Sequence, residues 1–128
     1  MYTPKQDKDI RCPLEYAYDI LSGRWKSRLM CLIDGEPRAF RYTELREGMI
    51  NISDAALSKA LRELIDDDMI ARVQYDEIPP RVEYYLTEKG KSFMPILKEM
   101  CAWGRTYYSF NSKNQMIQCL NCEHNTES

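Results

Sequence analysis

Apolar residues recur at the three- and four-residue spacing of one helical face in two segments near the start of the chain. The first segment predicts a helix over residues 13–21, with Cys12 as its N-terminal cap and a proline as its first residue. The second segment predicts a helix over about residues 25–33. Gly35 and Pro37 end this helix, because neither residue continues a helix without a cost.

The middle of the chain predicts a short strand, a helical turn and a longer helix. Residues 38–42 are long enough only for a strand of a few residues, and residues 43–46 predict a helical turn with Thr43 as its cap. Ser53 is the expected cap of the longer helix, which continues to about Asp67. The buried stripe of this helix is expected to consist of Leu57, Leu61, Leu64 and Ile65.

After residue 69 the pattern changes to β-branched and aromatic residues with mostly alternating polarity. Residues 70–75 and 82–86 therefore predict the two strands of a hairpin, joined by a turn that contains two prolines. Thr87 caps a final helix with a wide apolar stripe. This stripe is expected to contain Phe93, Ile96, Leu97, Met100, Cys101, Trp103, Gly104, Tyr107, Tyr108 and Phe110. A helix this apolar needs more packing partners than one small domain supplies.

The order of these elements is typical of a winged helix-turn-helix, a mainly α-helical α+β fold with a small hairpin. In this fold the longer helix, about residues 53–67, lies in the major groove of DNA. The wing, about residues 71–86, contacts the adjacent backbone or minor groove. Small domains of this shape also act as protein-interaction modules, so the topology alone leaves that alternative open.

The length of 128 residues and the mass of 15.1 kDa predict one folded domain. We place it at residues 12–110, after a flexible arm of residues 1–11 and before a disordered tail of residues 111–128. The sequence has no run of about 18 apolar residues and no signal-peptide pattern, which predicts a cytoplasmic protein without a membrane span. The five cysteines are accordingly expected to be thiols.

The overall charge does not indicate a nucleic-acid partner, because 18 basic and 20 acidic residues give a net charge of -2. The local charge does indicate one. Between residues 24 and 46 the basic residues Arg24, Lys26, Arg28, Arg38, Arg41 and Arg46 outnumber the acidic residues Asp34, Glu36 and Glu44. Such a local excess next to the motif is what phosphate contacts require.

Several short motifs together resemble the HxlR-type transcriptional regulators, a branch of the MarR-like winged-helix proteins. The motifs are Cys12-Pro13, Gly23-x-Trp25-Lys26, Leu61-Arg62-Glu63-Leu64, and Pro79-Pro80-Arg81-Val82-Glu83-Tyr84 leading to Leu86-Thr87-Glu88-x-Gly90. The resemblance covers residues 12–108. It implies a homodimeric DNA-binding regulator whose N-terminal and C-terminal helices make the dimer contacts.

The exposed face of the longer helix supplies most of the candidate DNA contacts. With the apolar stripe buried, this face presents Asp54, Ala55, Ser58, Lys59 and Arg62. Lys59 and Arg62 carry positive charge, and Arg62 can read a guanine with two hydrogen bonds. Ser53 and Ser58 can donate to phosphates or bases, and Asp54 can accept a hydrogen bond from cytosine.

Two of these residues have structural alternatives. Ser53 can serve only as the helix cap, and Arg62 can pair with Asp66 one turn later. Ala55 stands where relatives often carry a basic or long polar residue, so the operator sequence of a relative does not transfer to this chain.

Three cations outside the longer helix are further candidates. Arg81 follows two prolines that fix the turn and suits a narrow minor groove, unless it pairs with Glu77 or Glu83 instead. Lys26 and Arg41 resemble the positions around the motif that contact the DNA backbone.

Cys12 is the candidate for regulation. It lies at a helix N-terminus beside Arg11, and both features favour the reactive thiolate. In several HxlR-type regulators a cysteine at this Cys-Pro position senses electrophiles or oxidants, so the resemblance implies a redox switch. Other family members respond to small ligands, which leaves a non-thiol effector open. Cys31 and Cys101 are expected to pack on apolar faces, although either can partner Cys12 across a dimer.

Cys119, Cys122 and His124 have the chemistry of zinc ligands, but three ligands make a weak signal, and we expect no metal there. His124 is the only histidine, so no catalytic Cys–His pair can form elsewhere in the chain. The sequence also has no Gly-rich phosphate loop and no paired-carboxylate motif. We therefore expect no enzyme and no cofactor. The expected partners are an operator in double-stranded DNA, a second copy of the chain and a small electrophile or ligand.

Overall fold

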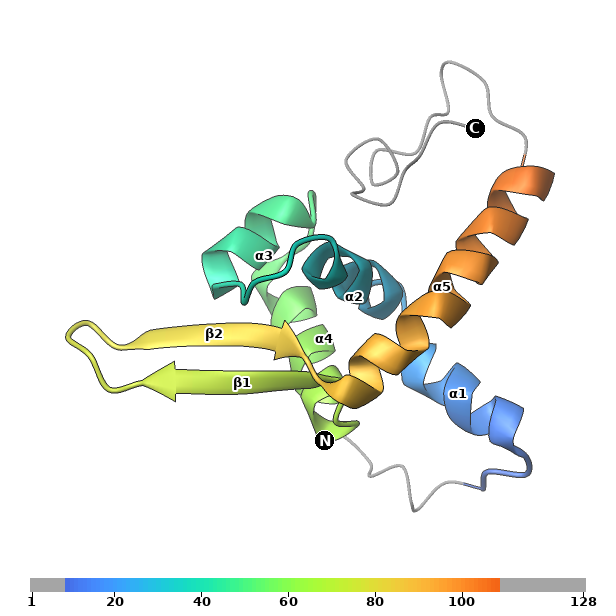
Figure 1. Cartoon of the computed structure of the whole chain (residues 1–128), viewed down its shortest axis with the longest axis horizontal. Coiled ribbons are helices and arrows are strands. Elements are labelled where there is room, and N and C mark those ends of the chain that lie inside the picture. The colour runs from blue at the N-terminus through green and yellow to red at the C-terminus, as the bar shows by residue number, and fades with distance from the viewer. Residues whose placement is uncertain (1–8, 109–128) are drawn as a thin grey trace.

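The computed structural model describes residues 9–108, which form five helices and one antiparallel hairpin (Figure 1). In chain order the elements are α1 (Pro13–Leu21), α2 (Lys26–Asp34), α3 (Tyr42–Gly48), α4 (Asp54–Asp66), β1 (Ile70–Tyr75), β2 (Arg81–Leu86) and α5 (Glu88–Tyr107). This is the predicted winged helix-turn-helix, with α3 and α4 as its motif and the hairpin as its wing. Among residues 9–108, no helix is long and apolar enough to cross a membrane.

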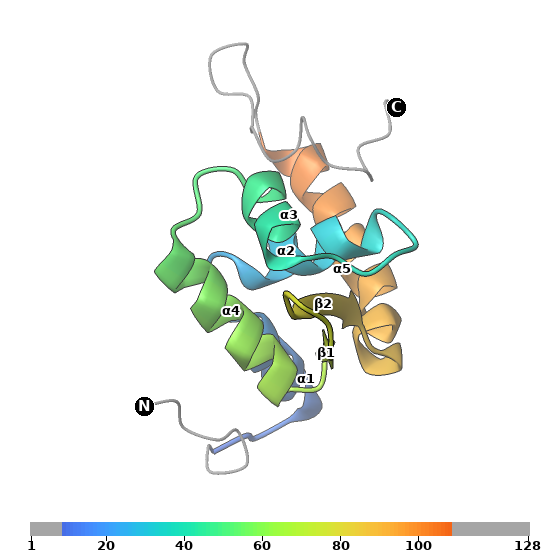
Figure 2. The ribbon, with the colours of Figure 1, turned by 90° about the vertical axis from the view of Figure 1, so that its left-hand side faces the viewer.

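One apolar core joins the helix-turn-helix to the wing. Its most deeply buried side chains are Leu29, Met30, Leu45, Met49, Leu57, Leu64, Met69 and Ile70, which come from α2, α3, α4, β1 and the segments between them. Figure 2 shows α4 beside the hairpin, with α5 behind them. The core therefore fixes the position of α4 relative to the wing.

α4 follows the pattern that the sequence predicts. Its N-cap is Ser53, whose Oγ accepts a hydrogen bond from the backbone N–H of Ala56 at 3.0 Å. Leu57, Leu61 and Leu64 are buried, together with Ala60, while Ile65 is half-buried at the edge of the stripe. The opposite face of α4 is left to solvent.

The hairpin pairs β1 with β2 in a register that places Ile70 opposite Leu86 and Arg72 opposite Tyr84. The short strand predicted at residues 38–42 is reduced to one bridge between Phe40 and Tyr84. The two residues exchange backbone hydrogen bonds of 2.8 and 2.7 Å. This bridge holds the chain before α3 against the wing.

α3 begins earlier than the sequence predicts. Its N-cap is Arg41, not Thr43, because the carboxylate of Glu44 accepts a hydrogen bond from the Arg41 backbone N–H at 2.8 Å. An acidic side chain three residues after the cap favours this start, whereas a Thr43 cap would have Arg46 in that place. The prediction of Thr43 as the cap was therefore wrong.

The two terminal helices expose large apolar side chains. Leu14 and Tyr18 on α1 are 76% and 73% exposed, and Trp103 and Tyr107 on α5 are 68% and 71% exposed. Figure 1 shows α1 and the end of α5 on the side of the molecule opposite the tip of the wing. The predicted arm (1–11) and tail (111–128) lie mostly or wholly outside the described residues, as does Phe110.

Candidate nucleic-acid interface

The exposed face of α4 presents Ser58, Lys59 and Arg62 to solvent, as the sequence predicts. Neither Lys59 nor Arg62 forms an ion pair with any residue in the range 9–108. The two positive charges are therefore available to an external anion. Ser53 lies at the start of the same face, but its Oγ is occupied as the helix cap.

Asp54 is held by two side chains of α3. Its Oδ1 lies 2.8 Å from Nε of Arg46 and accepts a hydrogen bond of 2.9 Å from the Tyr42 hydroxyl. These contacts tie the first turn of α4 to α3. They also neutralise a carboxylate that would otherwise repel phosphate.

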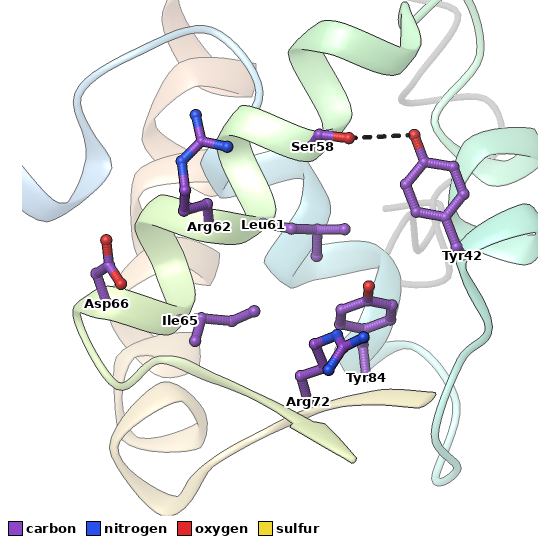
Figure 3. A pocket seen from close by; sticks show the side chains of 8 residues that line it. All are labelled: Tyr42, Ser58, Leu61, Arg62, Ile65, Asp66, Arg72 and Tyr84. Carbon is purple, nitrogen blue, oxygen red and sulfur yellow. Dashed lines mark hydrogen bonds between the residues drawn. The ribbon is translucent and has the colours of Figure 1, made fainter. Parts of the chain in front are cut away.

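Arg62 does not take the alternative partner that its sequence position offers. The structure has no ion pair between Arg62 and Asp66. Figure 3 shows the Arg62 side chain extending from α4 in a direction away from Asp66. The guanidinium group thus remains exposed on the same face as Ser58 and Lys59.

Lys26 is not on this surface. The residue is 3% exposed, and its Nζ lies 2.8 Å from Oε1 of Glu63 on α4. A buried, paired ammonium group does not reach a DNA phosphate, which corrects the sequence-based placement of Lys26 as a backbone contact. The pair instead joins α2 to α4 and holds the exposed face of α4 in place. Arg41, the other cation predicted there, is exposed at the start of α3.

Arg81 is engaged by two carboxylates of the hairpin. Its guanidinium lies 2.8 Å from Glu77 and 2.9 Å from Glu83, and it also stacks over the ring of Tyr75. The hydrogen bond to Glu77, reinforced by the one to Glu83, raises the pKa of Arg81 further above its ordinary value. Of the two alternatives for Arg81, the structure has the pairing with glutamates, so its charge is already compensated within the wing.

Glu44 combines capping with an ion pair beside this surface. Its carboxylate accepts from the Arg41 backbone N–H and lies 3.1 Å from Nη1 of Arg38. The Arg41 N–H and, next, the Arg38 side chain lower the pKa of Glu44 below its ordinary value of 4.5. The charged form of Glu44 therefore stabilises the start of α3.

A shallow pocket of about 270 Å³ opens between α4 and the hairpin. We call it the α4–hairpin pocket. Its lining includes Ser58 and Arg62, which the sequence singles out, and also Tyr42, Arg72 and Tyr84, which it does not (Figure 3). Arg72 and Tyr84 are cross-strand partners, so only the strand register brings their side chains together.

Cys12 is exposed at the N-cap of α1, and its side chain makes no capping hydrogen bond. Its neighbour Arg11 is paired with Glu15, at 2.7 Å between Nη2 and Oε2, so the cation expected beside the thiol is directed to a carboxylate. Cys31 packs against the core as predicted. Cys101 is exposed on α5, contrary to the expectation that it is a packing residue, because no element among residues 9–108 covers the face of α5 that carries it.

The weak zinc candidates Cys119, Cys122 and His124 lie outside the described residues. Within residues 9–108, no three His, Cys, Asp or Glu side chains are grouped so as to hold a metal ion. The described part of the chain therefore offers the α4 face and its flanks as the main candidate site.

Comparisons with known proteins point to one family. A sequence model described as HxlR-like helix-turn-helix matches residues 20–112. A relative from Methanothermobacter thermautotrophicus, named as an uncharacterized HTH-type transcriptional regulator, is 42% identical over 104 residues, 80% of this chain and 77% of the relative. Among solved structures, the redox regulator HypR in its oxidized form is 34% identical with a TM-score of 0.68, covering 77% of this chain and 100% of that chain. The reduced form of the transcriptional regulator YodB from B. subtilis is 30% identical with a TM-score of 0.68, covering 78% and 97%.

Proposed function

As the chain belongs to the HxlR-like helix-turn-helix family and is a transcriptional regulator with that fold, we propose that it binds a specific double-stranded DNA operator as a homodimer. In this proposal α4 enters the major groove, and the wing lies over the adjacent backbone or minor groove. The alternative, a winged-helix module that binds only other proteins, predicts no salt-dependent affinity for DNA.

The observation that carries the proposal is the exposed α4 face with two cations that have no partner among residues 9–108. Lys59 is long enough to pair with a phosphate at the groove edge, and Arg62 can donate two hydrogen bonds to one guanine. Ser58 adds a short donor on the same face, and Arg41 supplies positive charge at the start of α3. Asp54 keeps α3 and α4 together through Arg46.

The exposed apolar residues of α1 and α5 support a dimer. Soluble monomers rarely leave several large apolar side chains together on their surface, because covering them is favourable. A second copy that packs on these helices would cover Leu14, Tyr18, Trp103 and Tyr107 and place two α4 helices on one side of the assembly. Two recognition helices about one helical turn apart then read the two halves of an operator.

Fluorescence anisotropy tests the proposal, with the reduced protein and a labelled duplex from upstream of its own gene. We expect binding that an unlabelled copy of the duplex abolishes at a concentration where scrambled DNA does not. Sequence-specific recognition would be contradicted if scrambled DNA competed as well as the unlabelled copy for every duplex taken from upstream of the gene and of its neighbour.

We further propose that modification of Cys12 by an oxidant or electrophile alters operator affinity. The support is its exposed thiol at the start of α1, next to the proposed dimer surface, and the similarity to the redox regulator HypR. The alternative effector is a small ligand that does not react with thiols. We expect diamide to change the affinity of the wild-type protein but not of Cys12→Ser. An equal response of both proteins would assign the sensing to another thiol.

A further inference from the structure

The α4–hairpin pocket lies along one border of the exposed α4 face. Ser58 and Arg62 belong both to that face and to the pocket wall, so a ligand on the α4 face also meets the pocket (Figure 3). The opposite wall comes from the wing, through Arg72 of β1 and Tyr84 of β2. The pocket is thus continuous with the surface proposed to bind DNA.

The pocket combines an apolar floor with polar groups at its rim. Leu61, Ile65 and Tyr84 are buried or half-buried and form the floor. The charged residues of the lining are two arginines, Arg62 and Arg72, and one aspartate, Asp66. The lining has an excess of one positive charge, and this composition suits a group that is apolar on one side and anionic on the other.

The lining also carries two hydroxyl groups, from Tyr42 and Ser58. The Tyr42 hydroxyl donates its one proton to Oδ1 of Asp54 at 2.9 Å and lies 3.5 Å from Oγ of Ser58, so the Ser58 hydroxyl is the one that can donate to an external acceptor. Hydroxyl groups of tyrosine and serine commonly donate to the phosphate oxygens of DNA. The arrangement therefore offers one neutral donor, the Ser58 hydroxyl, beside the two cations.

The two arginines of the wing differ in their electrostatic surroundings. Arg81 is paired with Glu77 and Glu83. Within residues 9–108, Arg72 donates a hydrogen bond only to the neutral amide oxygen of Gln74, at 3.5 Å, and forms no ion pair. Neutralising a DNA phosphate releases counterions only if the protein cation is not already neutralised. The available positive charge of the described wing therefore lies at its base and not at its tip.

We propose that the α4–hairpin pocket binds one phosphodiester of the DNA backbone, with Arg72 as its cationic contact and the Ser58 hydroxyl as a further donor. The deoxyribose lies over the apolar floor, and Arg62 is left to reach from the pocket rim toward the base edges. This inference rests on the proposed function and assigns Arg72 to the interface. It also gives Arg81 a structural role, in which its ion pairs stabilise the wing.

The salt dependence of DNA affinity separates the two arginines. Arg72→Gln and Arg81→Gln remove the same charge from the same hairpin, so each is the control for the other. On the labelled upstream duplex, we expect Arg72→Gln to reduce the slope of log affinity against log salt by about 0.9 for each copy of the chain. We expect Arg81→Gln to leave the slope unchanged. Circular dichroism and thermal unfolding establish that both variants are folded.

A chemically altered duplex locates the contact. Neutral methylphosphonate groups replace single phosphates in turn along the duplex, and each duplex is titrated with wild type, Arg72→Gln and Ser58→Ala. We expect one position per half-site at which the replacement weakens the wild type several-fold but has little further effect on Arg72→Gln. If Arg72→Gln weakened binding only through a general loss of positive charge, no single phosphate would show this behaviour.

The outcomes separate the inference from the function on which it rests. If the wild type binds DNA with a steep salt dependence but Arg72→Gln has the same slope, the pocket is not a phosphate site. If Arg81→Gln and not Arg72→Gln lowers the slope, the wing contacts DNA through its tip and the inference is overturned. If the wild type has no salt-dependent affinity for any duplex, the proposed function fails together with the inference.

Discussion

The charged residues around α4 differ in how far their charges are already satisfied within the protein. Arg81 and Asp54 are each held by two partners, and Lys26 is buried against Glu63. Lys59 and Arg62 have no such partners among the described residues. A charge that is already paired within the protein helps to hold side chains in place, whereas an unpaired positive charge attracts an external anion.

At the residue scale, Glu44 gives a prediction for pH. Its pKa is lowered in the folded protein, so its carboxylate stabilises the fold above the ordinary value of 4.5, and this contribution disappears as pH falls through the lowered value. Glu44→Gln keeps an oxygen that can cap the helix but removes the charge. We expect the variant to be less stable than wild type by a few tenths of a kcal/mol at pH 7, with the difference vanishing under acidic conditions.

Urea unfolding at a series of pH values measures this difference. Glu47→Gln in the same helix is the control, because Glu47 has neither the Arg41 nor the Arg38 contact. A difference between wild type and Glu44→Gln that grows as pH falls would contradict the assignment.

At the element scale, the start of α5 contacts α1 and the segment that follows α4. Thr87 caps α5 by accepting from the Gly90 N–H at 3.0 Å and also donates to the carbonyl of Asp68. Lys89 donates to the Tyr16 hydroxyl on α1 at 2.8 Å and to the carbonyl of Asp67 at 2.9 Å. The first turn of α5 thus connects α1 to the end of α4, the helix proposed to read DNA.

Gly90 gives the element-scale prediction. It is buried, and a Cβ at this position would collide with the backbone carbonyl oxygen of Met69. The backbone cannot move aside as a side chain can, so we expect Gly90→Ala to lower the free energy of unfolding by about 1–3 kcal/mol. Thermal and urea unfolding measure this loss. Ser92→Ala, at an exposed position of the same helix, is the control, and equal stability of the two variants would contradict the close contact.

The sequence predicted the helices and strands well because each has a strong local signal. Apolar spacing located α1 and α4, a capping serine located the start of α4, and alternation located the hairpin. The prediction that Lys26 contacts the DNA backbone was wrong, because Lys26 lies on the buried face of α2. This face consists of Lys26, Leu29, Met30 and Ile33. A lysine on a buried face is understandable only when its partner is known, and Glu63 lies on another helix.

Part of the candidate site was predictable from the sequence, because the local pattern of one helix indicates it. Ser58, Lys59 and Arg62 follow from the amphipathic pattern of one helix. Arg72 does not, because its contribution depends on a strand register and on how the hairpin packs beside α4. The pairing of Arg81 was visible as one of two alternatives, and only the positions of Glu77 and Glu83 in space decided between them.

At the scale of the whole molecule, α1 and the end of α5, which carry exposed apolar side chains, lie on the side opposite the tip of the wing (Figure 1). Trp103 and Tyr107 pack against each other with ring centroids 5.1 Å apart, yet remain exposed. Such a surface is stabilised when a second copy covers it. The proposed dimer therefore determines the spacing of the two α4 helices.

We expect Trp103→Glu to convert the protein from a dimer to a monomer, because a carboxylate in an apolar interface would lose its hydration. Analytical ultracentrifugation measures the mass, which should fall from about twice 15.1 kDa to 15.1 kDa. Ile78→Glu is the control, since Ile78 is fully exposed at the tip of the wing. A monomeric wild type, or a dimer that survives Trp103→Glu, would contradict the placement of the interface on α5.

The measurement that tests the central claim most directly compares two charge-matched double variants for DNA affinity. Lys59→Gln with Arg62→Gln removes two cations from α4, and Lys91→Gln with Lys98→Gln removes two from exposed positions of α5. In anisotropy titrations on the upstream duplex, we predict that the α4 pair weakens binding at least about tenfold and lowers the salt slope. The α5 pair should bind as wild type does. Equal loss in both variants, or no loss in the α4 pair, would contradict DNA recognition by α4.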